Sequence, residues 1–309
     1  MKALVTGATG FVGGRLARRL QQGGAEVRCL VRDRLSPRAR ALDAEGFEVC
    51  VGDVLQPGSL AGAGAGVDVA YYLVHSMGRG GEQADFAASE RQAAAGFAQM
   101  VKQEGVERVI YLGGLGEKPG SRHLRSRHET AVQLQEHGPA LTYFRAGMVV
   151  GSDSESYRTL RYLVERLPAM IAPAWLNTRT QPIGIEDVLS YLSQAPAVEV
   201  STARELQIGG PDVLSYGEML DVMAVALGRR RRPKIPVPFV TPWLSSLWIG
   251  LVTPVDAGIA RPLIEGLSTE TVVTDNTALR MFDIDPAPFE RTLREAIAED
   301  PDLRPPRAE

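Results

Sequence analysis

The sequence predicts an α/β fold in which a doubly wound parallel sheet precedes a smaller, mostly helical C-terminal region. Three observations indicate this fold. Short apolar runs typical of strands alternate with longer segments of helical periodicity through the first half of the chain. A glycine-rich turn joins the first strand to the first helix. No internal repeat breaks the alternation, so we expect one parallel sheet with helices on both faces.

Length and composition are those of a large globular protein. The chain has 309 residues, of which 44% are hydrophobic and 23% are charged, enough for one large domain or one and a half. A formal net charge of -3 gives no basic field for nucleic acid. No apolar run reaches the roughly 18 residues that span a bilayer, and the first residues already form a strand instead of a signal peptide. We therefore expect a cytoplasmic protein.

The glycine-rich turn follows an apolar run at residues 3–5 and precedes a helical pattern that continues to Leu20. In such a turn Gly7 permits a sharp reversal, Gly10 lets the main chain approach a pyrophosphate, and Gly13 lets the helix pack close to the strand. The first amides of the helix then bind the phosphates. The predicted dinucleotide contacts in this turn are Thr6, Gly7, Thr9, Gly10, Phe11, Val12 and Gly13.

A second strand is predicted over Glu26–Val31, and Arg32 follows it near the position that recognises the ribose. NAD sites usually carry an acid there, whereas a guanidinium pairs well with the 2′-phosphate of NADP. Arg34 and Arg38 come shortly after Arg32, and Asp33 lies beside it. We expect NADP as the cofactor, with NAD as the alternative. The alternative for the arginines is that they only solvate a loop.

The third predicted strand, Phe47–Val51, leads to Asp53 and Val54. A carboxylate at the carboxyl end of a strand can accept a hydrogen bond from the adenine amino group. It can equally cap the short helix that follows. We place Asp53 and Val54 among the candidate cofactor contacts, and both interpretations of Asp53 stay open.

The fourth predicted strand is the strongly apolar segment Val67–Val74. The carboxyl ends of the strands line the ligand crevice of an open parallel sheet. Leu73, Val74 and His75 are therefore predicted to contact the cofactor. Because His75 and Ser76 fall near the nicotinamide half, they are also a candidate acid and a candidate hydroxyl for catalysis.

The sheet continues through a helix over Glu82–Glu104, a strand over Arg108–Leu112, a helix over Ser121–Glu136 and a sixth strand over Ala140–Phe144. Gly113 follows the fifth strand and is a further candidate cofactor contact. His123 and Arg127 lie one turn apart on the same face of the next helix.

The character of the sequence changes from about Gly151. We expect residues 151–178 to line the substrate side, with a helix over Tyr157–Leu167 and an apolar, proline-punctuated loop over Pro168–Pro173. The further elements predicted are an extended segment at Thr180–Ile183, a helix from Glu186, a strand over Glu205–Ile208, a helix over Ser215–Leu227, a helix over Pro286–Ala298 and a frayed polar tail over Asp300–Glu309.

We divide the chain into a dinucleotide-binding domain, residues 1–230, and a smaller substrate or lid region, residues 231–309. The run Arg229–Arg232 is predicted to cap a helix end and to face solvent. The segment Val237–Leu267 carries Trp243 and Trp248 with almost no charge. It is either a buried pocket wall or homodimer face, or a peripheral membrane contact. Its prolines and its lack of basic residues favour the buried alternative.

The two cysteines, Cys29 and Cys50, both fall in predicted strands. Neither has a Cys or His neighbour at the spacing of a metal site. We expect buried, reduced thiols and no bound metal.

Five segments in this order resemble the extended and atypical short-chain dehydrogenase/reductase superfamily. They are the glycine-rich turn, Asp53-Val54, YLGGLG at Tyr111–Gly116, FRAGMVVG at Phe144–Gly151 and TQPIGIEDV at Thr180–Val188. The likeness covers residues 1 to 230 and looks closest to the NmrA-like and YbjT-like members, whose consensus has segments similar to YYLVHSMG and NTRTQPI. The resemblance implies a Rossmann fold that binds NAD(P)(H), with a smaller C-terminal part over the substrate cleft.

The chain departs from that superfamily where active members carry their catalytic residues. These members have a Ser or Thr after the fifth strand and a Tyr-x-x-x-Lys motif, whose lysine lowers the pKa of the tyrosine. Here Gly113 and Gly114 follow the fifth strand, and no Tyr-x-x-x-Lys occurs anywhere in the chain. His123 and Arg127 stand at the tyrosine and lysine positions, and a solvated basic helix face is the alternative for that segment.

Two functions from different classes follow from these features. The first is an oxidoreductase that transfers hydride between NADP(H) and a small lipophilic carbonyl, quinone or alkene, with proton delivery by His123, Arg127 or His75. The second is a non-catalytic NADP(H) binder, a redox sensor or assembly protein of the NmrA-like kind. A nucleotide-sugar epimerase is a weaker third, because the usual Ser and Tyr-x-x-x-Lys are missing.

Overall fold

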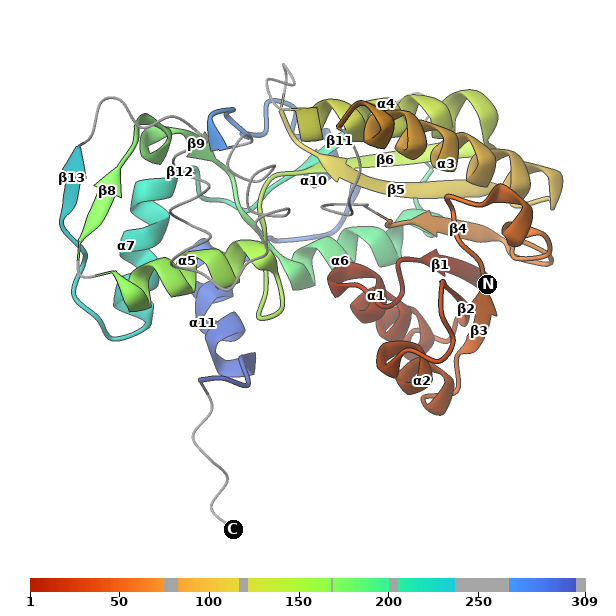
Figure 1. The fold of residues 1–309 in the computed structure, drawn as a ribbon, viewed down its shortest axis with the longest axis horizontal. Helices are drawn as coiled ribbons and strands as arrows, with labels where there is room; N and C mark the ends of the chain where they lie inside the picture. The colour runs from red at the N-terminus through yellow and green to blue at the C-terminus, as the bar shows by residue number, and fades with distance from the viewer. Residues whose placement is uncertain (75–82, 117–121, 168, 200–204, 237–266, 304–309) are drawn as a thin grey trace, which may run out of the picture.

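The structure, a computed structural model, describes residues 1–74, 83–116, 122–167, 169–199, 205–236 and 267–303. The strands of its main sheet are β1 (Lys2–Thr6), β2 (Glu26–Val31), β3 (Glu48–Val51), β4 (Val69–Tyr72), β5 (Arg108–Gly114), β6 (Ala140–Ala146) and β11 (Glu205–Ile208). They are all parallel and follow the order β11-β6-β5-β4-β1-β2-β3. The predicted doubly wound parallel sheet is therefore confirmed (Figure 1).

Helices cover both faces of this sheet (Figure 1). They are α1 (Phe11–Gln22), α2 (Pro37–Ala44), α3 (Gln83–Gln103), α4 (Arg122–His137) and α6 (Ile185–Gln194). Successive residues of a strand point to opposite faces. Val5 of β1 accordingly packs with Leu16 of α1, and Leu4 belongs to a second cluster with Phe97 of α3. The alternation of side chains along the strands thus separates two apolar layers.

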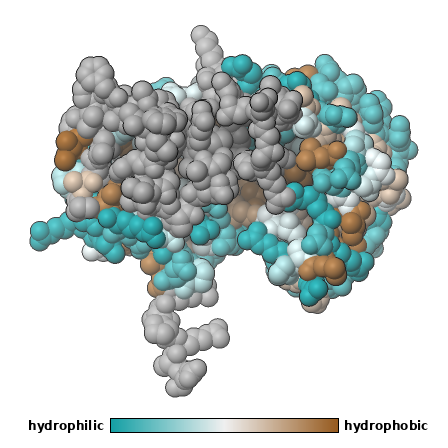
Figure 2. All heavy atoms as spheres, viewed as in Figure 1, coloured by the Kyte–Doolittle hydropathy of each residue, from teal (hydrophilic) through white to brown (hydrophobic). Residues whose placement is uncertain are grey.

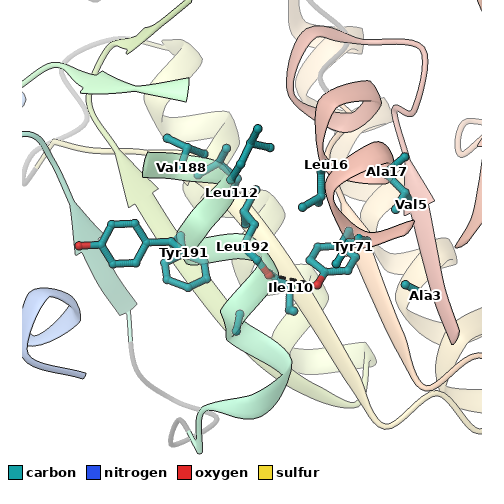
Figure 3. Close-up of a cluster of buried hydrophobic side chains, with 14 of the residues drawn as sticks. Ala3, Val5, Leu16, Ala17, Tyr71, Ile110, Leu112, Val188, Tyr191 and Leu192 are labelled. Carbon is teal, nitrogen blue, oxygen red and sulfur yellow. Dashed lines mark hydrogen bonds between the residues drawn. The ribbon is translucent and has the colours of Figure 1, made fainter. Parts of the chain in front are cut away.

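Figure 3 shows the layer between the sheet and α1 and α6. Tyr71 of β4 is fully buried there, and its hydroxyl donates a hydrogen bond of 3.1 Å to the carbonyl oxygen of Leu192 in α6. Burial without a nearby cation raises the pKa of Tyr71, so this phenol stays neutral. The buried hydroxyl is thus satisfied by the backbone of the helix that covers it.

A third apolar cluster lies beside the main sheet. It joins helices α5 (Glu155–Arg166), α7 (Tyr216–Ala226) and α11 (Phe289–Glu299). The remaining elements described are β7 (Val149–Val150), β8 (Met170–Ala172), β9 (Arg179–Thr180), β10 (Ile183–Gly184), β12 (Leu214–Ser215), β13 (Lys234–Pro236), α10 (Thr277–Met281) and three short 3₁₀ turns at Pro57–Leu60, Ala174–Asn177 and Ala195–Ala197. Three two-stranded sheets, β10-β7, β12-β9 and β13-β8, hold this part together.

Predictions for three strands, β8, β5 and β6, were wrong for the same reason. The apolar loop predicted at residues 168–173 contains strand β8, which pairs with β13 more than sixty residues later. Strands β5 and β6 both run two residues further than predicted, to Gly114 and Ala146, because they pair with each other there. A Cβ on Gly113 would lie 2.7 Å from the ring of Tyr143, so the glycine lets the two strands stay paired. Pairing partners distant in sequence decided these boundaries.

The C-terminal residues after α11 begin as an ordered segment, which corrects the predicted frayed tail over 300–309 for its first residues. Asp300 is only 3% exposed and accepts hydrogen bonds from the Tyr157 hydroxyl, at 2.9 Å, and from the Arg161 guanidinium, at 2.5 Å. Arg161 also pairs with Glu165 on its own helix. A carboxylate can be buried here because a cation and a phenol meet it.

The described part of the predicted C-terminal region packs against the rest of the chain. Phe282, which follows α10, contacts the rings of Phe144 and Tyr191 with centroids 5.6 and 5.3 Å apart. Helix α11 packs against α5 and α7 through Leu293 and Phe289. The domain boundary near residue 230 remains a prediction. Trp243 and Trp248 lie outside the described residues.

The arginine run after α7 caps a helix end as predicted, but the helix is α5. Arg229 and Arg232 donate to the carbonyl oxygens of Glu165 and Val164, at 3.4 and 3.0 Å, in the last turn of α5. Arg230 and Arg231 are exposed. Basic side chains at this end oppose the negative pole of the helix dipole.

Within the described ranges, no helix is both long and apolar enough to cross a bilayer. On the face shown in Figure 2, hydrophilic residues dominate the described surface and apolar ones form small separate patches. Cys29 is buried, which raises the pKa of its thiol to about 12, and Cys50 is half-buried. The described side chains include no group of three His, Cys, Asp or Glu residues arranged to hold a metal ion.

Candidate functional site

A cavity of about 830 Å³ opens at the carboxyl ends of β1, β4, β5 and β6. This is the edge of an open parallel sheet where ligands bind. One side of the cavity, the glycine-loop side, consists of residues 7–15 with Arg18, Arg38, Ala41 and Leu42. The other, the apolar side, consists mainly of Leu115, Leu124, Met148, Leu160, Leu163, Trp175, Tyr216, Leu220 and Leu267. The volume of the whole cavity is in the range of sites that bind organic ligands.

The glycine-loop side has the backbone geometry that a pyrophosphate requires. Gly7 has a φ of 65°, which disfavours other residues. A Cβ on Gly13 would lie 2.3 Å from the Gly7 carbonyl oxygen, so only glycine lets α1 pass this close to the turn. Gly10 caps α1 without a side chain and lines the cavity, as do Phe11 and Val12. The first-turn amides of α1 are therefore placed to receive an anion.

Thr6 contributes to the site indirectly. Its side chain is fully buried and lies outside the cavity lining. The hydroxyl donates to the Tyr71 carbonyl oxygen at 3.0 Å and accepts from the Leu73 amide at 2.9 Å. These bonds fix the end of β4 beside the glycine turn, and Leu73 lines the cavity there. Thr9, another predicted dinucleotide contact, lines the cavity.

The arginines after β2 occupy different positions. Arg32 is exposed and is not among the residues lining the cavity. Arg34 pairs with Asp43 at 2.9 Å. Arg38 lines the cavity, and its Nη1 donates to the Thr9 carbonyl oxygen at 2.9 Å. Ser36 caps α2, whose first residue is Pro37, and this helix start turns Arg38 back toward the glycine loop. In the sequence, Ser36-Pro37 is the pattern that marks this helix start and so the position of Arg38 in its first turn.

Neither Asp53 nor Val54 lines the cavity. One Asp53 carboxylate oxygen accepts from the Leu55 amide at 3.0 Å, and the Asp53 amide donates to the Ser59 hydroxyl at 2.9 Å. Asp53 thus organises the turn before the 3₁₀ segment at Pro57–Leu60. Val54 is buried in the cluster beneath α3. Val74 is half-buried against the same cluster.

At the ends of β5 and β6 the cavity wall is mostly backbone. Gly113 and Gly114 line it, together with Ala146 and Gly147. The Arg145 guanidinium donates to the carbonyl oxygens of Gly114 and Gly116 and pairs with Glu205. This arginine holds the turn after β5 in place beneath the cavity.

Of the three candidate catalytic residues, the structure locates one side chain at the site. Arg127 of α4 lines the cavity, and its Cδ would lie 3.3 Å from a Cβ on Gly114. His123 is in the first turn of α4, but its side chain lies outside the described part. His75 and Ser76 lie outside the described residues altogether.

Hydroxyl groups on the apolar side were not predicted. Thr271 lines the cavity, and its Oγ1 is 2.6 Å from Oγ1 of Thr180. Thr180 in turn hydrogen-bonds Tyr216, another lining residue. Burial raises the pKa of Tyr216 to about 12, although the hydrogen bond with Thr180 acts to lower it. The phenol is therefore neutral. No sequence signal links these three residues, because only folding brings them together.

Comparisons with known proteins agree with the glycine-loop geometry. A family described as NAD(P)H-binding matches residues 7–157. An NAD(P)H azoreductase from Xenophilus azovorans is 26% identical over 230 residues, covering 73% of this chain and 74% of that protein. A mitochondrial protein from Arabidopsis thaliana, NADH dehydrogenase [ubiquinone] 1 alpha subcomplex subunit 9, is 25% identical over 306 residues, covering 93% of this chain and 74% of that protein.

Among solved structures, the triphenylmethane reductase of Citrobacter sp. complexed with NADP(H) has a similar fold. Its TM-score is 0.71 at 16% identity, and the match covers 96% of this chain and all of that one. The parallel sheet order, the glycine turn and the family match agree with one another. Residues 7–157 match the model of the NAD(P)H-binding family, and the sheet order and the glycine turn are those of a Rossmann fold.

Proposed function

We propose that this protein is an NADPH-dependent reductase of a small lipophilic acceptor, such as a carbonyl compound, a quinone or an activated alkene. The observation that carries the proposal is the continuity of the cavity. A single space of about 830 Å³ joins the glycine loop to a wall of leucine, tryptophan and tyrosine side chains. A dinucleotide and an apolar molecule can therefore meet in it.

The names of two similar proteins support a reductase. One is named as an azoreductase and the other as a reductase of triphenylmethane compounds, which carry aromatic rings. An acceptor of that kind would fit beside Trp175 and Tyr216, whose rings meet edge to face at 6.1 Å. The acceptor would thus bind by apolar and aromatic contact, with few polar groups to orient it.

Bound NADPH supplies the hydride in this proposal. The amides of the first turn of α1 would hold its pyrophosphate, and Arg38, which lines the cavity beside the glycine loop, would pair with a 2′-phosphate. Arg127 contributes a positive charge near the ends of β5 and β6, where negative charge develops on a reduced carbonyl or quinone oxygen. The neutral phenol of Tyr216 and the hydroxyl of Thr271 can donate hydrogen bonds to that oxygen. His123 and His75 remain proposed proton donors.

Single-turnover oxidation of bound NADPH tests the proposal. The panel contains quinones, enones, aldehydes, an azo dye and a triphenylmethane dye, each mixed with protein and with free NADPH alone. We expect at least one class to oxidise bound NADPH faster than free NADPH, and Arg127→Ala to slow that reaction about 100-fold with NADPH affinity retained. If no compound exceeds the free-NADPH rate, the second candidate replaces the first.

The second candidate is a non-catalytic NADP(H) binder that acts within an assembly or as a redox sensor. Two observations favour it. The Ser and Tyr-x-x-x-Lys of active short-chain dehydrogenases are absent from the sequence, and one relative is named as a subunit of NADH dehydrogenase. In that case the dinucleotide would bind tightly and remain unoxidised across the whole panel. Native mass spectrometry of protein purified without added nucleotide would show it bound.

A further inference from the structure

Helix α1 is fastened to the segment that leads into α5 by a cluster of five residues. We call Phe11, Arg15, Gly151, Ser152 and Glu299 the α1–α5 clasp. The Arg15 Nη2 atom lies 2.9 Å from the Ser152 hydroxyl, 3.2 Å from an Asp153 carboxylate oxygen and 3.4 Å from a carboxylate oxygen of Glu299, the last residue of α11. The Ser152 hydroxyl donates to Glu299 at 3.1 Å. Ser152 is only 6% exposed, so these contacts form a packed junction.

An aromatic contact reinforces the same junction. The Arg15 guanidinium lies over the Phe11 ring, 5.4 Å from its centroid. A Cβ on Gly151 would lie 2.7 Å from the Phe11 ring and 2.9 Å from Ile185. Gly151 therefore leaves the space that the Phe11 ring needs. Phe11 and Arg15 lie one turn apart on α1, so both side chains reach the same neighbour.

The two elements that the clasp joins line opposite sides of the cavity. Phe11 and Arg15 belong to the first turns of α1, where the pyrophosphate is expected. Gly151 and Ser152 immediately precede Ser154, which caps α5 by accepting from the Tyr157 amide at 3.1 Å. The inward face of α5 then contributes Thr159, Leu160 and Leu163 to the cavity. Only Asp153 separates Ser152 of the clasp from Ser154, the cap of α5.

We propose that the α1–α5 clasp couples dinucleotide binding at the glycine loop to the ordering of α5, the helix that lines the apolar side of the cavity. A dinucleotide that fixes the first turn of α1 also fixes Phe11 and Arg15, and through them the start of α5. By thermodynamic linkage, an acceptor that orders α5 strengthens dinucleotide binding by the same factor. The coupling rests on NAD(P)H binding and holds for a reductase or for a non-catalytic binder.

Hydrogen exchange on the full chain, with and without NADPH, measures this coupling directly. In the wild type, NADPH slows exchange of the α5 amides at least about fivefold, the lower limit of usual coupling factors. Ser152→Ala and Glu299→Gln remove the slowing while NADPH affinity stays within about twofold, because neither residue lines the cavity. Arg15→Gln removes it as well, although Arg15 lines the cavity and its loss also weakens binding.

Arg19→Gln is the matched control. Arg19 lies one turn beyond Arg15 and pairs with Glu186 and Ser190 of α6, a helix that covers the main sheet. Its loss removes a similar set of contacts but none to α5, so the slowing persists. The proposal is overturned if Ser152→Ala and Glu299→Gln keep the wild-type slowing, or if wild-type protein binds NADPH without any change in α5. Failure of every acceptor in the reduction panel leaves the coupling intact.

Discussion

The two sides of the cavity differ in how the chain builds them. The glycine-loop side comes largely from one continuous stretch, residues 7–15, with help from α2. The apolar side is gathered from segments as far apart as Leu115, Leu163, Tyr216 and Leu267. The first side needs particular residues at particular positions, because a side chain there would strike backbone atoms. The second needs only apolar volume, which many sequences can supply.

This difference explains why the sequence points to particular dinucleotide contacts on the glycine-loop side but to no particular contacts on the apolar side. A positive φ at Gly7 and the close passage of α1 at Gly13 leave a fixed spacing in the sequence. The leucines of the apolar side follow no recognisable spacing in the sequence, because leucines of an ordinary hydrophobic core would look the same. Substitutions on each side can therefore test whether the two sides act separately.

The largest effect is expected on the glycine-loop side, from Gly10→Val. A branched side chain there would occupy the space of the pyrophosphate, and loss of two or three charge-assisted hydrogen bonds of about 1.5–3 kcal/mol each lowers NADPH affinity at least about 150-fold. The fold survives, because a Cβ on Gly10 meets only the Gly7 carbonyl oxygen at 3.1 Å. Calorimetric titration and circular dichroism check both statements.

Gly13→Val is the companion variant. Its Cβ would lie 2.3 Å from a backbone oxygen, so we expect loss of the folded state as well as of binding. Tight NADPH binding by folded Gly10→Val protein would contradict the role given to the loop.

The next largest effect concerns the anchoring of α5 on the apolar side. Asp300→Asn removes the most buried carboxylate that pairs with Arg161, and we expect a loss of about 3 kcal/mol in the free energy of unfolding. Asp302→Asn removes a longer, largely exposed contact to the same arginine, at 3.3 Å, and costs less than about 1 kcal/mol. Urea unfolding of the two variants makes the comparison. Equal losses of unfolding free energy in the two variants would mean that the buried Asp300–Arg161 pair stabilises the protein no more than the exposed Asp302–Arg161 contact.

A smaller effect is expected from Trp175→Ala, which removes an aromatic ring from the apolar side of the cavity. Burial of a large apolar side chain contributes about 1.5–3 kcal/mol, so the KM of a lipophilic acceptor rises about 10- to 100-fold while the Kd of NADPH is unchanged. Trp175→Phe, which keeps an aromatic ring, retains most of the affinity. A parallel loss of NADPH affinity would show that the two sides are not separable.

The smallest effect concerns cofactor choice. The sequence predicts Arg32 as the selector for NADP, whereas among Arg32, Arg34 and Arg38 it is Arg38 that lines the cavity. We expect Arg38→Gln to lower the ratio of NADP to NAD affinity about tenfold, through loss of one charge-assisted contact. Arg32→Gln should change the ratio less. A larger drop for Arg32→Gln would return the assignment to the residue that the sequence indicates.

Local signals predicted much of the fold well. Strands β2 and β11 have the predicted bounds, and Ser215 caps α7 with a full capping box. Strand β8 was missed because its pairing partner lies in β13. Asp300 was placed in a polar tail because a carboxylate gives no sign of burial until its partners, Arg161 and Tyr157, are known.

The sequence by itself determined the parallel sheet and the dinucleotide loop, since both follow from short-range rules: side-chain alternation along strands and glycine where backbone atoms crowd. Only the tertiary structure decided which arginine reaches the cavity, which hydroxyls meet at Tyr216, and how Arg15 joins α1 to α5. Those contacts link residues that lie tens to hundreds of positions apart. Their geometry depends on how complete elements pack, and that packing leaves no pattern in neighbouring residues.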